Sequence, residues 1–175
     1  MKYRLSFVLI LVMLALSVVA NAQNTVINIA VPTDPDSFDP ARSIAAATAE
    51  IAFNIYEGLV KSTPEGTVTG ALASHWEIDE SLTEYTFVLR DAYFHNGAKV
   101  TADDVVYSLN RARDPKTGQK SADFASIKDV VVSGDDVKII LYEPYAPLLY
   151  ELTELAAAIY PQNANNLSTN PIGTG

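Results

Sequence analysis

The sequence predicts an α/β or α+β fold in which helices pack on a mixed sheet, and three segments support this. Residues 84–90 alternate between apolar and polar side chains, which is typical of a strand with one buried face. Residues 127–132 and 137–142 are rich in β-branched side chains and flank a turn sequence, so we expect a hairpin. Residues 44–57 are rich in alanine, which has the highest helix propensity, so we expect a helix there.

A second helix is expected to begin after Thr101. Asp104, three residues further on, completes the pattern of a capping box with Thr101. Val105 and Leu109 are four residues apart and therefore lie on the same face of this helix. The Asp-Pro pair at 114–115 ends the helix, because a residue that precedes proline disfavours the helical conformation.

The remaining elements are assigned from β-branched runs, turn residues and proline. A strand is expected over residues 25–31, and the three aspartates and three prolines of residues 32–40 predict a loop after it. We expect the helix over 44–57 to end at Gly58. Further along the chain we expect a turn at 64–66, a short strand at 76–80, a tight turn at 96–97, a helix over 147–155 and a short strand at 156–160.

The first 22 residues have the pattern of a secretory signal peptide. Lys2 and Arg4 provide a positive start, residues 7–16 are an unbroken apolar run, and Ala20-Asn21-Ala22 is a small-residue cleavage site. A membrane anchor is the alternative, but a spanning helix needs about 20 predominantly apolar residues. We therefore expect residues 1–22 to be cleaved after Ala22 and residues 23–175 to form part of one secreted domain.

Charge and cysteine content exclude several classes of function. The formal net charge is −9, which argues against binding nucleic acid or anionic lipid, because both need a surplus of Lys and Arg. The chain has no cysteine, which excludes thiol catalysis, zinc–cysteine sites and a lipid-modified N-terminal cysteine. We expect the mature protein to be free in the periplasm and monomeric.

No catalytic or metal-binding motif stands out. His75 and His95 lack the spacing of a metal site and are expected to be structural. Asp34, Asp36 and Asp39 are close enough in sequence to suggest Ca²⁺, but the loop lacks the glycine and distal glutamate of an EF-hand. Turn formation explains these aspartates better, because Asp hydrogen-bonds its neighbouring backbone. Neither a nucleophile elbow nor a phosphate-binding glycine loop is present, and we expect no cofactor.

Four segments resemble the extracellular solute-binding proteins of family 5, the peptide/nickel type that includes oligopeptide- and dipeptide-binding proteins. The third segment is the most specific, and the order and spacing of all four strengthen the resemblance. The segments are residues 36–40 (DSFDP), 55–60 (IYEGLV) with 70–77 (GALASHWE), 85–90 (YTFVLR) through 94–97 (FHNG) to 101–108 (TADDVVYS), and 170–175 (NPIGTG). Phe38 replaces the usual leucine and Asn96 the usual aspartate, and Asn and Asp suit such turns equally.

The resemblance implies a clamshell of the type II periplasmic binding protein kind, in which two lobes close on a ligand. Family members are much longer than this chain, so we expect a truncated N-terminal portion. It would contain the first strand of the main lobe and the small accessory domain, a mixed sheet with helices. A part without the opposing lobe is expected to have little or no ligand affinity.

The resemblance also implies ligand contacts. In relatives the segment after the first Asp-Pro turn lines the cleft, which here corresponds to Ile44, Ala45 and Ala46. An aromatic residue after a later Asp-Pro turn reaches the ligand, and the nearest candidate here is Phe124. Ordinary core packing is the alternative for Phe124, because buried phenylalanine is common.

The function that the resemblance implies is capture of a peptide, or a related small solute, and its delivery to the permease of an ABC importer in the inner membrane. The chain would then not be an enzyme. A secreted hydrolase whose catalytic residues lie beyond residue 175 is the alternative. The ligands of relatives include peptides, nickel complexes, haem and oligosaccharides, and the residues present do not select among these.

Overall fold

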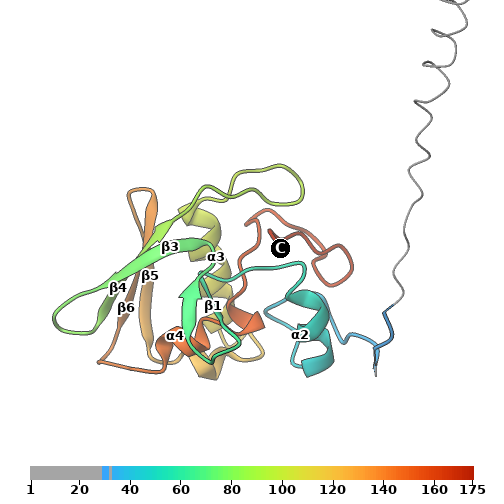
Figure 1. The fold of residues 1–175 in the computed structure, drawn as a ribbon, viewed down its shortest axis with the longest axis horizontal. Helices are drawn as coiled ribbons and strands as arrows, with labels where there is room; N and C mark the ends of the chain where they lie inside the picture. Colours follow the sequence, from blue (N-terminus) through green and yellow to red (C-terminus); the bar gives the residue numbers. More distant parts are fainter. Residues whose placement is uncertain (1–28, 32) are drawn as a thin grey trace, which may run out of the picture. The chain divides into compact units, whose positions relative to one another are not determined.

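An antiparallel four-stranded sheet lies at one end of the fold in the structure, a computed structural model that describes residues 29–31 and 33–175 (Figure 1). Its strands lie in the order β3-β4-β6-β5, and a separate two-stranded ladder joins β1 and β2. The elements in chain order are α2 (Ala46–Ala52), β1 (Val60–Ser62), β2 (Val68–Gly70), β3 (Ala73–Ile78), β4 (Glu84–Leu89), α3 (Ala102–Arg113), the 3₁₀ helix η1 (Ser121–Phe124), β5 (Ile127–Ser133), β6 (Asp136–Leu141), α4 (Leu148–Glu151) and the 3₁₀ helix η2 (Leu155–Ala157).

The sheet confirms the strands predicted from alternation. In β4, Tyr85 and Phe87 are buried, and they pair with Ile139 and Val137 of β6. β5 and β6 form the predicted hairpin, which turns at Gly134 with a φ of 68°, a left-handed conformation that glycine adopts without strain. Every ladder among the described residues is antiparallel, so the mixed sheet that we expected is not found in this part of the chain.

Helix α3 begins and ends where the sequence predicts. The Asp104 amide donates to Thr101 Oγ1 at 3.3 Å, and the Thr101 amide donates to Asp104 Oδ2 at 3.0 Å, so both halves of the capping box form. Val105 and Leu109 are buried on the face that packs against β5 and β6. The helix ends at Arg113, and its C-cap Asp114 is extended and directly precedes the proline.

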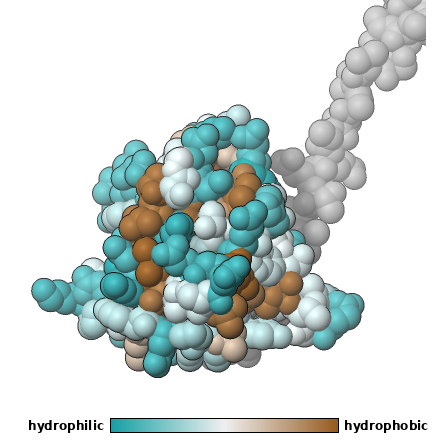
Figure 2. All heavy atoms as spheres, turned by 90° about the vertical axis from the view of Figure 1, so that its left-hand side faces the viewer, coloured by the Kyte–Doolittle hydropathy of each residue, from teal (hydrophilic) through white to brown (hydrophobic). Residues whose placement is uncertain are grey.

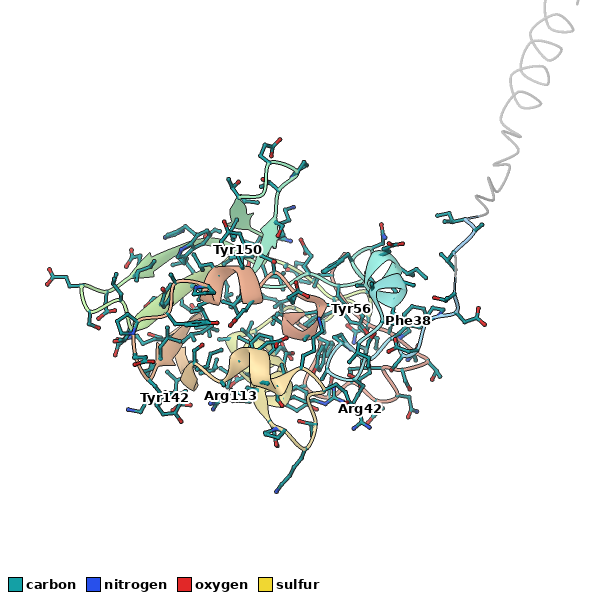
Figure 3. All side chains as sticks on the ribbon, turned by 90° about the horizontal axis from the view of Figure 1, so that it is seen from below. Phe38, Arg42, Tyr56, Arg113, Tyr142 and Tyr150 are labelled. Atoms are coloured by element: carbon teal, nitrogen blue, oxygen red, sulfur yellow. The ribbon has the colours of Figure 1, made fainter. Side chains whose placement is uncertain are left out.

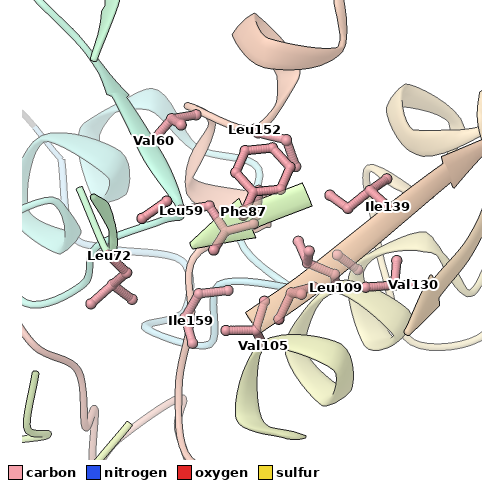
Figure 4. Packing of buried hydrophobic residues seen from close by; sticks show 14 of the residues in the cluster. Leu59, Val60, Leu72, Phe87, Val105, Leu109, Val130, Ile139, Leu152 and Ile159 are labelled. Carbon is pink, nitrogen blue, oxygen red and sulfur yellow. The ribbon is translucent and has the colours of Figure 1, made fainter. Parts of the chain in front are cut away.

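One large hydrophobic cluster lies between the sheet, α3 and the segments that follow β6. Phe87, Val105 and Ile139 are fully buried in it (Figure 4). Leu152 and Ile159 close the cluster from the C-terminal part of the chain (Figure 4). Burial of apolar side chains of this size contributes about 1.5–3 kcal/mol each, so this cluster is the main source of stability.

The face of the molecule at the sheet end carries separate hydrophobic patches among hydrophilic residues (Figure 2). Ile78 at the end of β3 and Val132 near the end of β5 are among the exposed apolar side chains of the sheet. Scattered exposed apolar residues of this kind are normal on a protein surface.

The alanine-rich helix is shorter than predicted. We expected residues 44–57, but α2 spans Ala46–Ala52 and the chain turns at Phe53. The Asn54 side chain donates to the carbonyls of Glu50 and Ile51, at 3.0 and 3.3 Å, and the Asn54 amide donates to the Ile51 carbonyl as well, so Asn54 satisfies acceptors at the end of the helix. Alanine content therefore predicted the helix but not its end.

The two C-terminal predictions differ more from the structure. The helix expected over 147–155 is reduced to α4, Leu148–Glu151. The strand expected at 156–160 is wrong, because the chain there forms η2 and then runs extended without joining a ladder, and the Ile159 amide donates to the Glu57 carbonyl at 2.9 Å. Residues 156–160 are all buried, so their apolar composition reflects burial and not strand pairing.

Predictions for the N-terminus fall mostly on residues outside those that the structure describes. These are the signal peptide over 1–22 and residues 25–28 of the first expected strand; residues 29–31 are described and form no strand. Among the described residues, no helix is both long and apolar enough to cross a membrane.

Candidate ligand-binding site

Three of the four predicted contact residues line one hollow. Ile44, Ala45 and Ala46 border a cavity of about 310 Å³ at the N-terminal end of α2. Ile44 is 67% exposed, so its side chain is available to a ligand. The other residues that line this Ile44 hollow are Ser43, Ala49, Glu50, Phe53, Lys120, Glu154, Leu155 and Ala156.

A second hollow adjoins the first. It has a volume of about 500 Å³, and Phe53 and Glu154 line both cavities. Phe53 is 52% exposed, which places a large aromatic surface at the boundary. The remaining residues that line this Gly58 hollow are Tyr56, Glu57, Gly58, Val60, Lys61, Ser62, Ala71, Thr153 and Gly175. Apolar walls with a few charged groups are typical of small-ligand sites.

Phe124 lies elsewhere. Its side chain is 1% exposed and belongs to the main hydrophobic cluster. It borders a different cavity of about 380 Å³, together with Arg113 and Tyr142, and neither the Ile44 nor the Gly58 hollow. The structure thus brings Ile44, Ala45 and Ala46 together and leaves Phe124 apart from them, and a ligand contact by Phe124 stays a prediction.

The Asp36 carboxylate organises the segment that leads into the Ile44 hollow. Its Oδ2 accepts from the amides of Ile44 and Ala45 at 3.0 and 3.3 Å. Its Oδ1 accepts from Ser43 Oγ at 2.7 Å and from Thr48 Oγ1 at 2.6 Å. Desolvation opposes the charge, but hydrogen bonds from Thr48, Ile44 and Ser43 outweigh it and hold the pKa of Asp36 well below its usual range.

Asp39 anchors the same loop to α3. It is buried, and both of its carboxylate oxygens accept from the Arg111 guanidinium, at 2.6 and 2.5 Å. Arg111 also donates to the Tyr160 hydroxyl at 3.0 Å and lies over that ring, 5.6 Å from its centroid. The bond to Asp39 raises the pKa of Arg111, and burial raises the pKa of Tyr160 to about 12, so both groups keep their protons at neutral pH.

Tyr56 completes this anchor from the other side. Its hydroxyl donates to the Phe38 carbonyl at 3.0 Å, and Figure 3 shows the two residues close together beside α2. Its ring packs edge-on against Tyr160, with the centroids 6.5 Å apart. Burial, followed by the charge of Asp39, raises the pKa of Tyr56 well above its usual value. The loop therefore contacts both tyrosines of this small hydrophobic cluster: Tyr56 binds it directly, and Tyr160 binds it through Arg111.

The two histidines have structural contacts. His95 donates its backbone amide to the Gly173 carbonyl at 2.9 Å, and its Nε2 lies 2.9 Å from the Gly175 carbonyl. His75 is exposed on β3 with Ser74 Oγ 3.1 Å from its Nδ1. Within residues 29–31 and 33–175 no cluster of His, Cys, Asp or Glu could hold a metal ion.

Several residues of the site were not found from the sequence. Lys120 and Glu154 form an ion pair of 3.2 Å at the edge of the Ile44 hollow, although they are 34 positions apart. Arg111 and Asp39 are 72 positions apart. Sequence spacing gives no signal for such pairs, because each depends on how distant segments pack.

Comparisons with known proteins identify a family. Residues 67–175, more than half of the chain, match the family described as bacterial extracellular solute-binding proteins, family 5, middle. Di/tripeptide-binding protein 2 of Pseudomonas aeruginosa is 29% identical over 98% of this chain and 38% of its own length. The probable D,D-dipeptide-binding periplasmic protein DdpA of Escherichia coli is 36% identical over 72% of this chain and 26% of its own length. The chain thus spans well under half of these relatives.

Solved structures agree with the fold. AgaA of A. tumefaciens R10, in complex with agropinic acid, superposes with a TM-score of 0.76 at 30% identity over 81% of this chain and 30% of that one. DppA of Helicobacter pylori, in complex with the peptide STSA, has a TM-score of 0.70 at 29% identity, over 81% of this chain and 34% of that one. NikZ of Campylobacter jejuni, in complex with Ni(L-His), has a TM-score of 0.70 at 28% identity, over 83% of this chain and 31% of that one. The described α/β unit therefore matches part of a periplasmic binding protein.

Proposed function

Because this chain belongs to the bacterial extracellular solute-binding proteins of family 5, we propose that it is the N-terminal part of a protein that captures small peptides in the periplasm and delivers them to an ABC importer. The family consists of non-catalytic substrate-binding proteins of transporters, so the chain is not an enzyme and the hydrolase alternative is set aside. The observation that carries the proposal is the match of residues 67–175 to this family.

The choice of peptide is supported by the names of relatives. Di/tripeptide-binding protein 2 matches nearly the whole chain, and DppA was solved with a tetrapeptide. Other solved relatives hold agropinic acid or a nickel–histidine complex, so a similar fold accommodates different ligands. A binding test must therefore include these ligands as alternatives to peptides.

The Ile44 and Gly58 hollows are the proposed contact surface of this part of the protein. Ile44, Ala45 and Ala46 would meet the ligand with small or apolar side chains, which suits a ligand of variable sequence. Phe124 is a further proposed contact. A ligand held between two lobes favours the closed state only by its higher affinity for that state. Residues 23–175 alone are thus expected to bind weakly or not at all.

The first test is a thermal-shift screen of the complete protein, from which residues 1–22 are removed, with tri-alanine, nickel–histidine and agropinic acid. A ligand at 100 times its Kd stabilises the folded state by about 2.7 kcal/mol. We expect a clear shift with tri-alanine. A shift with nickel–histidine or agropinic acid and none with tri-alanine would contradict the assignment to peptides.

The second test concerns the contact surface. We expect Ile44→Thr to weaken binding of tri-alanine severalfold, because an exposed apolar contact is lost. Ile78→Thr is the matched control, since Ile78 is also an exposed isoleucine but lies at the end of β3. Equal affinity of both variants, measured by calorimetry, would show that the Ile44 hollow does not face the ligand.

A further inference from the structure

We infer that Asp36 is a positioning residue, which fixes the backbone shape that residues 44–46 present to the ligand. The inference rests on the proposed function, because it assumes that these residues meet the ligand. Asp36 itself lines neither the Ile44 nor the Gly58 hollow. Its effect on binding would therefore be indirect and would pass through the residues that it holds.

The first argument is the direct contact with the contact segment. One carboxylate oxygen, Oδ2, accepts from the backbone amides of both Ile44 and Ala45. Ala45 is the N-cap of α2, so Asp36 binds the amide of the N-cap itself and that of the residue before it. Asp36 supplies a carboxylate to this turn from eight and nine positions earlier in the chain.

The second argument concerns the other oxygen. Oδ1 accepts from the hydroxyls of Ser43 and Thr48, which flank the contact segment. Both residues are buried, with exposed fractions of 4% and 0%. The Thr48 hydroxyl also accepts from the Asp36 amide at 3.0 Å, which closes the loop on itself. Without the carboxylate, both hydroxyls would need new partners, and an unsatisfied buried hydroxyl is costly.

Together these contacts hold the segment on both sides and in its middle. Ser43 lies before it, Ile44 and Ala45 within it, and Thr48 after it. Charge-assisted hydrogen bonds of this kind are stronger than neutral ones. A neutral or absent side chain at position 36 would therefore let the contact segment relax, while the sheet and α3 stay unchanged.

Asp79 provides a matched control within the same chain. Its carboxylate also organises a turn, accepting from the amides of Thr83 and Glu84 at 2.9 and 2.8 Å and from the Ser81 amide at 3.2 Å. The hydrogen bond from the Ser81 side chain is the largest influence that lowers its pKa, to about 2. Asp79 follows β3 and lines neither hollow, so its loss should disturb a turn without changing the site.

The experiment compares Asp36→Asn with Asp79→Asn in the complete protein, using tri-alanine as the probe. We expect Asp36→Asn to weaken binding about tenfold, equivalent to about 1.4 kcal/mol, and Asp79→Asn to leave Kd unchanged. Thr48→Val should weaken binding as well, and Thr48→Ser, which keeps the hydroxyl, should restore it. Hydrogen exchange should show faster exchange of the Ile44 and Ala45 amides in Asp36→Asn alone.

The outcomes separate the inference from the proposed function. Wild-type affinity in Asp36→Asn, or an equal loss in Asp79→Asn, would overturn the positioning role while peptide binding stands. Absence of tri-alanine binding by the wild-type protein would overturn the proposed function and the positioning role with it. If Asp36→Asn fails to fold, Thr48→Val and its Thr48→Ser rescue decide the question.

Discussion

The sheet with α3 and the loop of residues 36–48 are stabilised in opposite ways. The sheet half buries regular rows of apolar side chains such as Phe87 and Ile139, and its polar backbone groups pair in ladders. The loop has a single short helix, and carboxylates hold it: Asp36 binds its backbone and hydroxyls, and Asp39 binds Arg111 on α3.

This difference means that the residues that stabilise the fold and those that shape the proposed ligand site are largely different. In the sheet half many side chains share the burial, so one polar exchange on its surface has little effect. In the loop a few charged hydrogen bonds fix the backbone that the ligand is proposed to meet. Loss of the Asp36 carboxylate should therefore change the site while the sheet keeps its structure, whereas core substitutions should mainly lower stability.

The largest expected effect belongs to the sheet half. Phe87→Ala should lower the free energy of unfolding by about 3–5 kcal/mol, because it removes a fully buried ring and leaves a cavity. Ile78→Thr, at an exposed position of the same sheet, should change it by less than about 0.5 kcal/mol. Urea unfolding measures both. A similar cost for the two variants would remove the contrast between core and surface.

The next effect concerns the ion pair between Arg111 on α3 and Asp39 in the loop. Arg111→Met should cost about 3 kcal/mol, because it leaves the Asp39 carboxylate buried without its partner. The double variant Arg111→Met with Asp39→Asn should recover much of this loss, since no charge is then left buried. Strict additivity of the two single substitutions, measured by urea unfolding, would argue against a coupled pair.

A smaller effect is expected at the cap of α3. Thr101→Ala should cost about 1 kcal/mol, because the Asp104 amide loses its acceptor. Thr101→Ser keeps the hydroxyl and should stay close to wild type. Thr101 caps α3, which packs on the sheet, so Thr101→Ala should leave ligand affinity unchanged. A change in Kd at Thr101→Ala would show that the two halves are not independent.

The smallest effect is a dependence of stability on pH. Asp36 has a lowered pKa, so its charged form stabilises the folded state above the unfolded value of 3.8, and this contribution is lost as the pH falls below that value. The stability difference between wild type and Asp36→Asn should be present at pH 7 and shrink towards pH 3. Unfolding curves at both pH values measure it, and a constant difference would contradict the charge-based account.

Local patterns predicted the sheet half well. The alternation of residues 84–90, the hairpin around Gly134 and the capping box at Thr101 all involve residues within a few positions of one another. The end of α2 and the segment that follows α4 were predicted less well. Alanine content indicated α2 but extended it to residue 57, and the buried apolar run at 156–160 was assigned to a strand that does not form.

The sequence by itself determined the family resemblance, the main strands and helix α3, and the segment 44–46 as a candidate contact. It could not show that Lys120 and Glu154 would border the same hollow, or that Asp39 would bind Arg111, because these residues are far apart along the chain. Periodicity and capping relate near neighbours, whereas a cavity and a buried ion pair depend on how distant segments pack. The tertiary structure alone decided those contacts.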